Sequence, residues 1–219
     1  QEPPDIQYLD LNLSNKCNLK CRMCSSHSSS AWVPEEKILL EGGPRNFRLN
    51  KNPKLHHVDY EKVMATFSNP HPFRNLKHIA LQGGEPLMEE KNLELLQKFV
   101  DWGLARQITI DLSTNGSILS KQIQDLIPKF KSVDMYISIE AVGELYQYIR
   151  GGTHFSVSDL ERNLYQFRRI SNLNIFFAVT TSVYNILYLS PLLEWFDGIR
   201  QAGEEMVMSN TVVRPEYLS

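Results

Sequence analysis

Residues 17–24 read CNLKCRMC, and they contain all three cysteines of the 219-residue chain, Cys17, Cys21 and Cys24. This CxxxCxxC run comes shortly after residues 8–13, whose alternation of apolar and polar side chains predicts a strand. Thiols that gather in one short loop, with none elsewhere, indicate a shared ligand rather than packing or disulfides. A cubane iron–sulfur cluster normally takes four thiolates, so three of them leave one iron free to bind an exchangeable ligand.

A second kind of metal site also fits this loop. His27 follows Cys24 by three positions, so the three cysteines and this histidine predict, as the alternative, a closed Cys3His zinc site. The chain would then be a zinc-stabilised binding or interaction module without catalysis. The spacing alone leaves both interpretations open.

Composition places the chain among globular proteins. Hydrophobic residues make up 42%, charged residues 22%, and the formal net charge is -2, which gives no electrostatic case for nucleic acid or an anionic membrane as a partner. No apolar run reaches the length of a membrane span, and the first residues do not resemble a signal peptide. With clustered thiols and no mark of secretion, we expect a cytoplasmic protein. We expect residues 1–219 to form one core domain, cut short at its C-terminal side.

Six predicted strands alternate with helices along the chain. No hairpin signal joins the strands, so the pattern predicts an α/β fold of parallel βαβ units. Residues 25–54 form a long excursion, and Arg150 is placed in a loop. The predicted strands are residues 8–13, 78–82, 108–112, 133–139, 174–181 and 205–213, and the predicted helices are 31–40, a helix capped by Asp59, 89–103, 119–130, 158–170 and 187–202.

The unusual residues fall where the predicted strands end. In parallel α/β folds the ligand site collects at the carboxyl ends of the strands, so we expect one rim to carry the site. Gly83 and Gly84 have no Cβ and suit a backbone that passes close to a ligand. Ser138 and Glu140 stand two apart on one strand, so their side chains are expected on the same side.

Taken together, these residues resemble the radical S-adenosylmethionine (SAM) enzymes, and the resemblance covers nearly the whole chain. CxxxCxxC after the first strand and GGE after the second, here residues 83–85, are the motifs of that family. Residues 8–32 and the YIRG run at 148–151 are most similar to members with a C-terminal twitch extension. The resemblance implies a six-stranded parallel (β/α)6 partial barrel of the TIM type.

The resemblance also implies cofactors and an activity. Cys17, Cys21 and Cys24 would hold a [4Fe-4S] cluster whose open iron is chelated by the amino nitrogen and carboxylate of SAM. An electron from the cluster would cleave SAM to methionine and a 5′-deoxyadenosyl radical that abstracts hydrogen from a peptide or small-molecule substrate. A donor such as flavodoxin or ferredoxin would supply the electron, and the substrate itself is not identified.

Eight residues are implied in SAM binding, and none is assigned to catalysis on the substrate. The GGE run would contact the methionyl amino group, and the two polar residues after the fourth strand would meet the ribose. Arg150 would form a fork with the SAM carboxylate, while Met23 stands where many members have an aromatic residue and would pack on adenine. The full set is Met23, Gly83, Gly84, Glu85, Thr114, Ser138, Glu140 and Arg150.

Overall fold

The computed structural model describes residues 5–42, 52–151 and 154–209. Its centre is one six-stranded sheet in which every neighbouring pair of strands is parallel and the spatial order equals the chain order. This open, consecutively ordered sheet confirms the predicted parallel α/β fold and is consistent with a partial TIM barrel. The strands are β1 (Tyr8–Asn12), β2 (His78–Gln82), β3 (Thr109–Thr114), β4 (Ser132–Ser138), β5 (Leu173–Thr180) and β6 (Glu205–Ser209).

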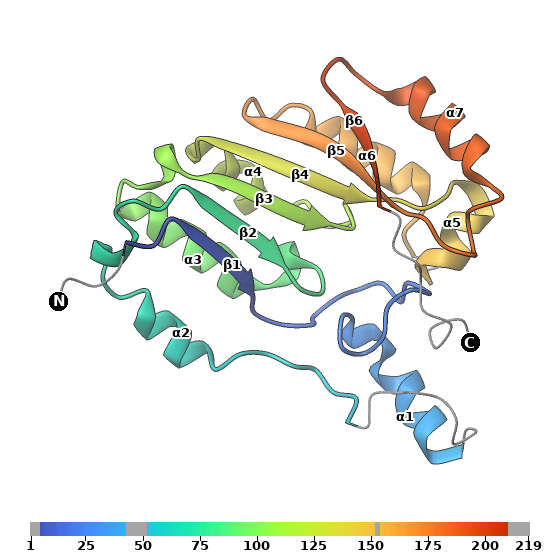
Figure 1. Ribbon diagram of the computed structural model, residues 1–219, viewed down its shortest axis with the longest axis horizontal. Helices are drawn as coiled ribbons and strands as arrows, with labels where there is room; N and C mark the ends of the chain where they lie inside the picture. The colour runs from blue at the N-terminus through green and yellow to red at the C-terminus, as the bar shows by residue number, and fades with distance from the viewer. Residues whose placement is uncertain (1–4, 43–51, 152–153, 210–219) are drawn as a thin grey trace.

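Helices join the strands, and Figure 1 shows α3, α4 and α6 along one face of the sheet. The arrowheads of the strands point toward the side where α1 and α5 lie, so the carboxyl ends of the strands meet there. The α-helices are α1 (Val33–Gly42), α2 (Tyr60–Thr66), α3 (Glu90–Asp101), α4 (Lys121–Leu126), α5 (Gly143–Arg150), α6 (Val157–Phe167) and α7 (Leu189–Ile199). Short 3-10 turns occur at Ser30–Trp32, His71–Phe73, Pro86–Met88, Ala105–Gln107 and Ile127–Lys129.

The core lies between the sheet and these helices. Alternate residues of β4 are buried, which is the period expected when one sheet face is covered. Helix α3 contributes Leu95 and Phe99, both fully buried, from its apolar side. The opposite face of the sheet carries rows of side chains in register, one of which runs through Asp10, Ala80, Asp111, Asp134 and Asn174.

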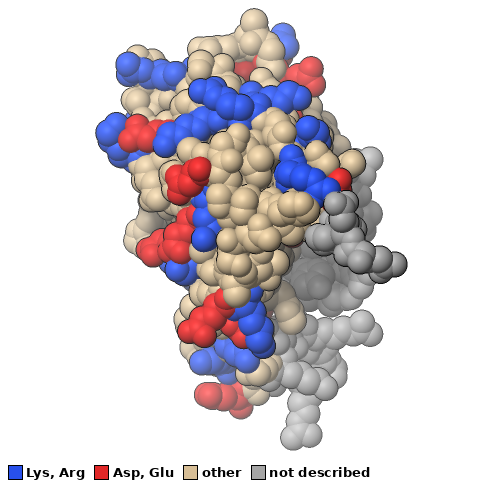
Figure 2. All heavy atoms as spheres, turned by 90° about the vertical axis from the view of Figure 1, so that its left-hand side faces the viewer, with Lys and Arg blue, Asp and Glu red and all other residues tan. Residues whose placement is uncertain are grey.

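The outer surface carries charges of both signs. Figure 2 views the molecule from the side where the strands begin, and Lys and Arg form a band near its top while acidic groups are interspersed below. In the described ranges, no helix combines the length and apolarity needed to cross a bilayer.

Several expected boundaries differ from the structure, each for a local reason. The segment expected as a loop before Arg150 is helix α5, which lacks a side-chain N-cap and begins at Gly143, so its start carries no signal in the sequence. The helix expected over 119–130 begins after the Ser120 cap and turns into a 3-10 turn at Ile127, because Pro128 lacks an amide hydrogen. Asp59 caps α2 as predicted. The last four residues of the strand expected over 205–213 lie outside the described residues.

Candidate active site

The cysteine loop follows β1 and is held by hydrogen bonds from two other segments. The indole N–H of Trp32 donates to the carbonyl of Cys21 over 3.0 Å, and the Ser29 hydroxyl donates to the carbonyl of Leu19 over 2.6 Å. The amide of Arg22 donates to the carbonyl of Ile149 in α5 over 2.7 Å. The loop is therefore fixed from both sides before any ligand binds.

All three cysteines line one cavity of about 190 Å³ at the carboxyl ends of the strands. The two glycines after β2 line the same cavity, as do the serines at the ends of β3 and β4 and the guanidinium-bearing Arg150. Leu19, Ser28 and Ser29 contribute to the lining. The other ten lining residues are the three cysteines and residues of the predicted rim, namely Cys17, Cys21, Cys24, Gly83, Gly84, Ser113, Thr114, Asn115, Ser138 and Arg150.

Glycine is required at residues 83 and 84 because two loops touch there. The amide of Gly84 donates to the carbonyl of Ser14 over 3.1 Å, so the loop after β2 runs beside the loop after β1. A Cβ on Gly83, which has φ +123°, would lie 2.6 Å from the Ser14 carbonyl oxygen, and one on Gly84 would collide with the backbone of Asn15 and Lys16. The glycines were expected to admit a ligand; the structure shows that they admit the neighbouring chain segment.

Glu85 is buried and its carboxylate is satisfied by protein donors. The Thr114 hydroxyl and the Leu87 amide donate to Oε1 over 2.8 and 3.1 Å, and the Asn115 amide donates to Oε2 over 2.7 Å. Burial raises the pKa of Glu85, and these hydrogen bonds oppose the rise. The side chain lies outside the cavity lining and ties the end of β2 to the end of β3.

Asn115 is a site residue that the sequence did not single out. Its side-chain amide donates to Oδ1 of Asn18 over 2.9 Å and lies 3.9 Å from Sγ of Cys17. Residues 113–116 were recognised as a polar strand end, but nothing in the sequence separates Asn115 from its neighbours.

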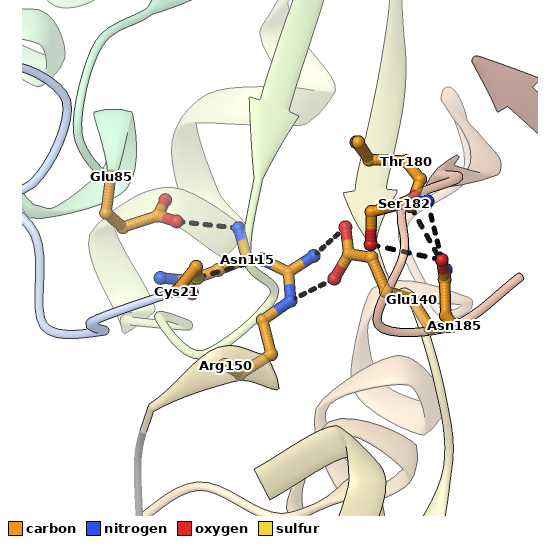
Figure 3. Close-up of polar contacts among 8 residues, drawn as sticks. All are labelled: Cys21, Glu85, Asn115, Glu140, Arg150, Thr180, Ser182 and Asn185. Atoms are coloured by element: carbon orange, nitrogen blue, oxygen red, sulfur yellow. Dashed lines mark hydrogen bonds and ion pairs between the residues drawn. The ribbon is translucent and has the colours of Figure 1, made fainter. Parts of the chain in front are cut away.

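Figure 3 shows the ion pair that Arg150 forms with Glu140. Nε of Arg150 lies 2.6 Å from Oε2 of Glu140, and Nη2 donates to Oε1 over 2.9 Å. The remaining donor, Nη1, points to Sγ of Cys21 at 3.5 Å. Arg150 was expected to contact the SAM carboxylate through two donors, and in the structure these two donors contact Glu140. Glu140 lies outside the cavity lining, whereas Ser138 is part of the lining.

The segment around Glu140 is held by hydrogen bonds from the loop after β5. The buried amide of Asn185 donates to the carbonyls of Glu140 and Thr180, each over 3.0 Å, and its own oxygen accepts from the Ser182 amide over 2.7 Å. Burial raises the pKa of Glu140 to about 7, and the charge of Arg150 opposes this shift.

The electrostatics of the cysteines favour a thiolate at Cys21. A hydrogen bond from Cys24, together with the charge of Arg150, lowers the pKa of Cys21 to about 6, although burial opposes this. The same hydrogen bond and burial raise the pKa of Cys24, and burial raises that of Cys17. Thiolates are the ligands of iron–sulfur clusters, so three thiols around a cavity with a cation beside one of them fit such a group.

The alternative zinc site is not favoured by the geometry. His27 is exposed and does not line the cavity. Among the residues with described positions, no three His, Cys, Asp or Glu side chains are arranged to hold a single metal ion, as a closed tetrahedral site requires. Cluster thiolates each bind a different iron and need not converge on one point.

Met23, which was expected to pack on adenine, is half-buried against the core and is absent from the cavity lining.

Comparisons with known proteins give relatives and fold neighbours. The chain is 27% identical over 121 residues to GTP 3′,8-cyclase of Aliarcobacter butzleri, covering 55% of this chain and 31% of that protein. The structure of anSMEcpe with bound AdoMet matches with a TM-score of 0.63 and 17% identity, over 92% of this chain and 52% of that one. A structure of the same protein with AdoMet and the Kp18Cys peptide matches with a TM-score of 0.55 and 18% identity, over 94% and 51% of the two chains.

A third neighbour is the radical SAM methyltransferase TsrM from Kitasatospora setae, with cobalamin and a [4Fe-4S] cluster bound. It matches with a TM-score of 0.58 and 12% identity, over 93% of this chain and 36% of that one. The chain thus spans about a third to a half of the length of these proteins. The family model of the radical SAM superfamily matches residues 11–180. Since this match covers most of the sequence and includes every cysteine, the chain belongs to the radical SAM superfamily.

Proposed function

We propose that this chain is the core domain of a radical SAM enzyme, with a [4Fe-4S] cluster on Cys17, Cys21 and Cys24 and SAM in the adjoining cavity. The observation that carries the proposal is that the three thiols and the glycine pair line one cavity at the carboxyl ends of parallel strands. When bound, these cofactors supply a one-electron reductive cleavage of the SAM sulfonium that leads to hydrogen abstraction from a substrate.

The residues around the cavity divide into those that face SAM and those that hold the site together. Gly83, Gly84, Thr114 and Ser138 line the cavity and are the proposed SAM contacts. Of the other four residues of the predicted set, Arg150 also lines the cavity, and the remaining three lie outside the lining. Glu85 joins the loops after β2 and β3, Met23 packs against the core from within the cysteine loop, and Glu140 orients Arg150.

The substrate is proposed to lie against the sheet face away from the helices. Ser113 lines the cavity and stands in register with Tyr136, whose ring stacks on Phe176 at 5.0 Å between centroids. This polar and aromatic surface continues from the site where the radical would form. We propose that the substrate is a peptide or a small molecule.

We further propose that a flavodoxin or ferredoxin donates the electron and that the protein is cytoplasmic. In the whole protein, a twitch extension is proposed to follow this domain.

The proposal is tested by anaerobic reconstitution of the chain with iron and sulfide. We expect a brown protein with about four irons per chain that forms 5′-deoxyadenosine from SAM when a strong chemical reductant is added. Cys21→Ser should abolish both the iron and the product, while His27→Ala should change neither. A protein that takes up zinc instead, and that loses it in His27→Ala, would refute the proposal in favour of the Cys3His module.

A further inference from the structure

Arg150 places a fixed positive charge directly against one of the three cysteine sulfurs. Arg150 is the last residue of α5 and is 5% exposed. Nη1 donates to Sγ of Cys21 at 3.5 Å, so no other side chain separates the guanidinium from the sulfur. A charge enclosed in this way is screened little by solvent, and its field at the sulfur is strong.

Glu140 fixes the direction of this guanidinium. Its carboxylate meets Nε and Nη2, the two donors on the edge of the guanidinium that does not face Cys21. Two contacts of this kind hold a planar guanidinium in one orientation, which leaves Nη1 as the donor for the sulfur. The carboxylate lies behind the guanidinium, so the cation is the nearer charge for Cys21.

We propose that Arg150, oriented by Glu140, raises the reduction potential of the cluster bound at Cys21. The inference rests on the proposed function, because it requires a cluster on the cysteines. Reduction adds one electron from an external one-electron reductant to the cluster and neither forms nor breaks a bond. A cation and a hydrogen bond at a ligand sulfur stabilise the form with the additional negative charge, and both are known determinants of cluster potentials.

The test compares potentials in the absence of SAM, so that contacts of Arg150 with SAM cannot contribute. Arg150→Met removes the charge and the donor while keeping an unbranched stem. Because a buried carboxylate left alone is destabilising, the double variant Glu140→Leu/Arg150→Met serves as the second variant, in which neither charge of the pair remains. The measurement is a potentiometric titration followed by the electron paramagnetic resonance signal of the reduced cluster.

The chain contains a matched control at the other end of the sheet. Arg168 and Glu204 form a half-buried two-contact pair, with Nε to Oε1 and Nη2 to Oε2 both at 2.7 Å. Arg168 follows α6 and Glu204 immediately precedes β6, so this pair lies where strands begin and not where the cysteines lie. Arg168→Met should therefore lower stability without changing the potential.

We expect the potential to fall in Arg150→Met, to fall by less in the double variant because the opposing charge of Glu140 is removed as well, and to be unchanged in Arg168→Met. Unchanged potentials in both Arg150 variants, with an intact cluster, would overturn the inference and leave the pair a structural one. A fall of equal size in Arg168→Met would also overturn it, because the shift would then report general destabilisation. If the wild-type chain binds no cluster, the proposed function itself fails, and this outcome is visible before any potential is measured.

Discussion

The carboxylate of Glu85 accepts a hydrogen bond from the backbone amide of Asn115 over 2.7 Å, and so joins the loop after β2 to the loop after β3. Since Gly84 in the same run binds the segment after β1, three consecutive strand ends are tied together around the cavity. The GGE run is thus a structural junction of the site as well as part of its lining.

Replacing Glu85 by Gln should destabilise the chain. The Glu85 carboxylate accepts from three donors, whereas a Gln side chain has only one oxygen that can accept. Its NH2 group would replace the second oxygen and would then point at a hydrogen-bond donor. We expect the free energy of unfolding to fall by about 1–3 kcal/mol, measured by urea denaturation. Glu194→Gln, at an exposed position of α7, is the matched control and should leave the midpoint unchanged. Equal midpoints for the two variants would contradict the role given to Glu85.

Replacing Gly84 by Ala should separate the loops after β1 and β2. The new Cβ would collide with the backbone of Asn15 and Lys16, so we expect lower stability and weaker cluster uptake, measured as iron per chain after reconstitution. The control is Gly198→Ala in α7, where a Cβ meets nothing within 4 Å. That variant should gain about 0.5–1 kcal/mol of helix stability. Normal iron uptake by Gly84→Ala would show that the close approach of the loops is dispensable.

Asp111→Asn should stabilise the chain at neutral pH. Asp111 and Asp134 are directly opposed on β3 and β4, and like charges so placed are destabilising by about 0.2–1 kcal/mol. Asp10→Asn, in the same row but separated from Asp111 by Ala80, is the control and should have a smaller effect. Chemical denaturation at pH 7 measures both variants, and a loss of stability in Asp111→Asn would show that the repulsion is compensated.

The gain from Asp111→Asn should depend on pH in a defined direction. Burial, followed by repulsion from Asp134, raises the pKa of Asp111 above its ordinary 3.8, while His78 opposes the rise. The folded state therefore holds this proton more tightly than the unfolded state. The stability that protonated Asp111 contributes is complete below the pKa of this carboxyl in the unfolded state, and it is lost as the pH rises through the pKa in the folded state. The variant's advantage should accordingly disappear on acidification, and an advantage that grows at low pH would refute this assignment.

Removing the cluster should lower thermal stability. A group that binds the folded chain alone shifts the unfolding equilibrium toward the folded state, so we expect the apo protein to melt below the reconstituted one by roughly 4–8 °C, equivalent to about 2 kcal/mol. Anaerobic circular dichroism before and after chelation measures the difference. Cys21→Ser should show no difference between the two treatments, and a difference that persists in this variant would mean that the iron binds elsewhere.

The order of strands and helices could be predicted because it is encoded locally. Alternation in residues 8–12 and the apolar run in residues 78–82 identify strands by their neighbours in sequence, and Asp59 identifies the start of α2 by its capping side chain. Helix α5 was not predicted because no side chain caps its start and it is only eight residues long, so that its stability depends on the buried contacts of Tyr146 and Ile149.

The sequence by itself determined the family, the parallel fold and the gathering of the three cysteines in one loop, because spacing and periodicity are properties of the chain alone. Only the tertiary structure decided the partners of the buried charges. Glu140 and Arg150 are ten residues apart, and the structure pairs them with one another while Arg150 also lines the cavity. Two ionisable groups removed from water must neutralise each other or a ligand, and the relative placement of β4 and α5 decides that choice.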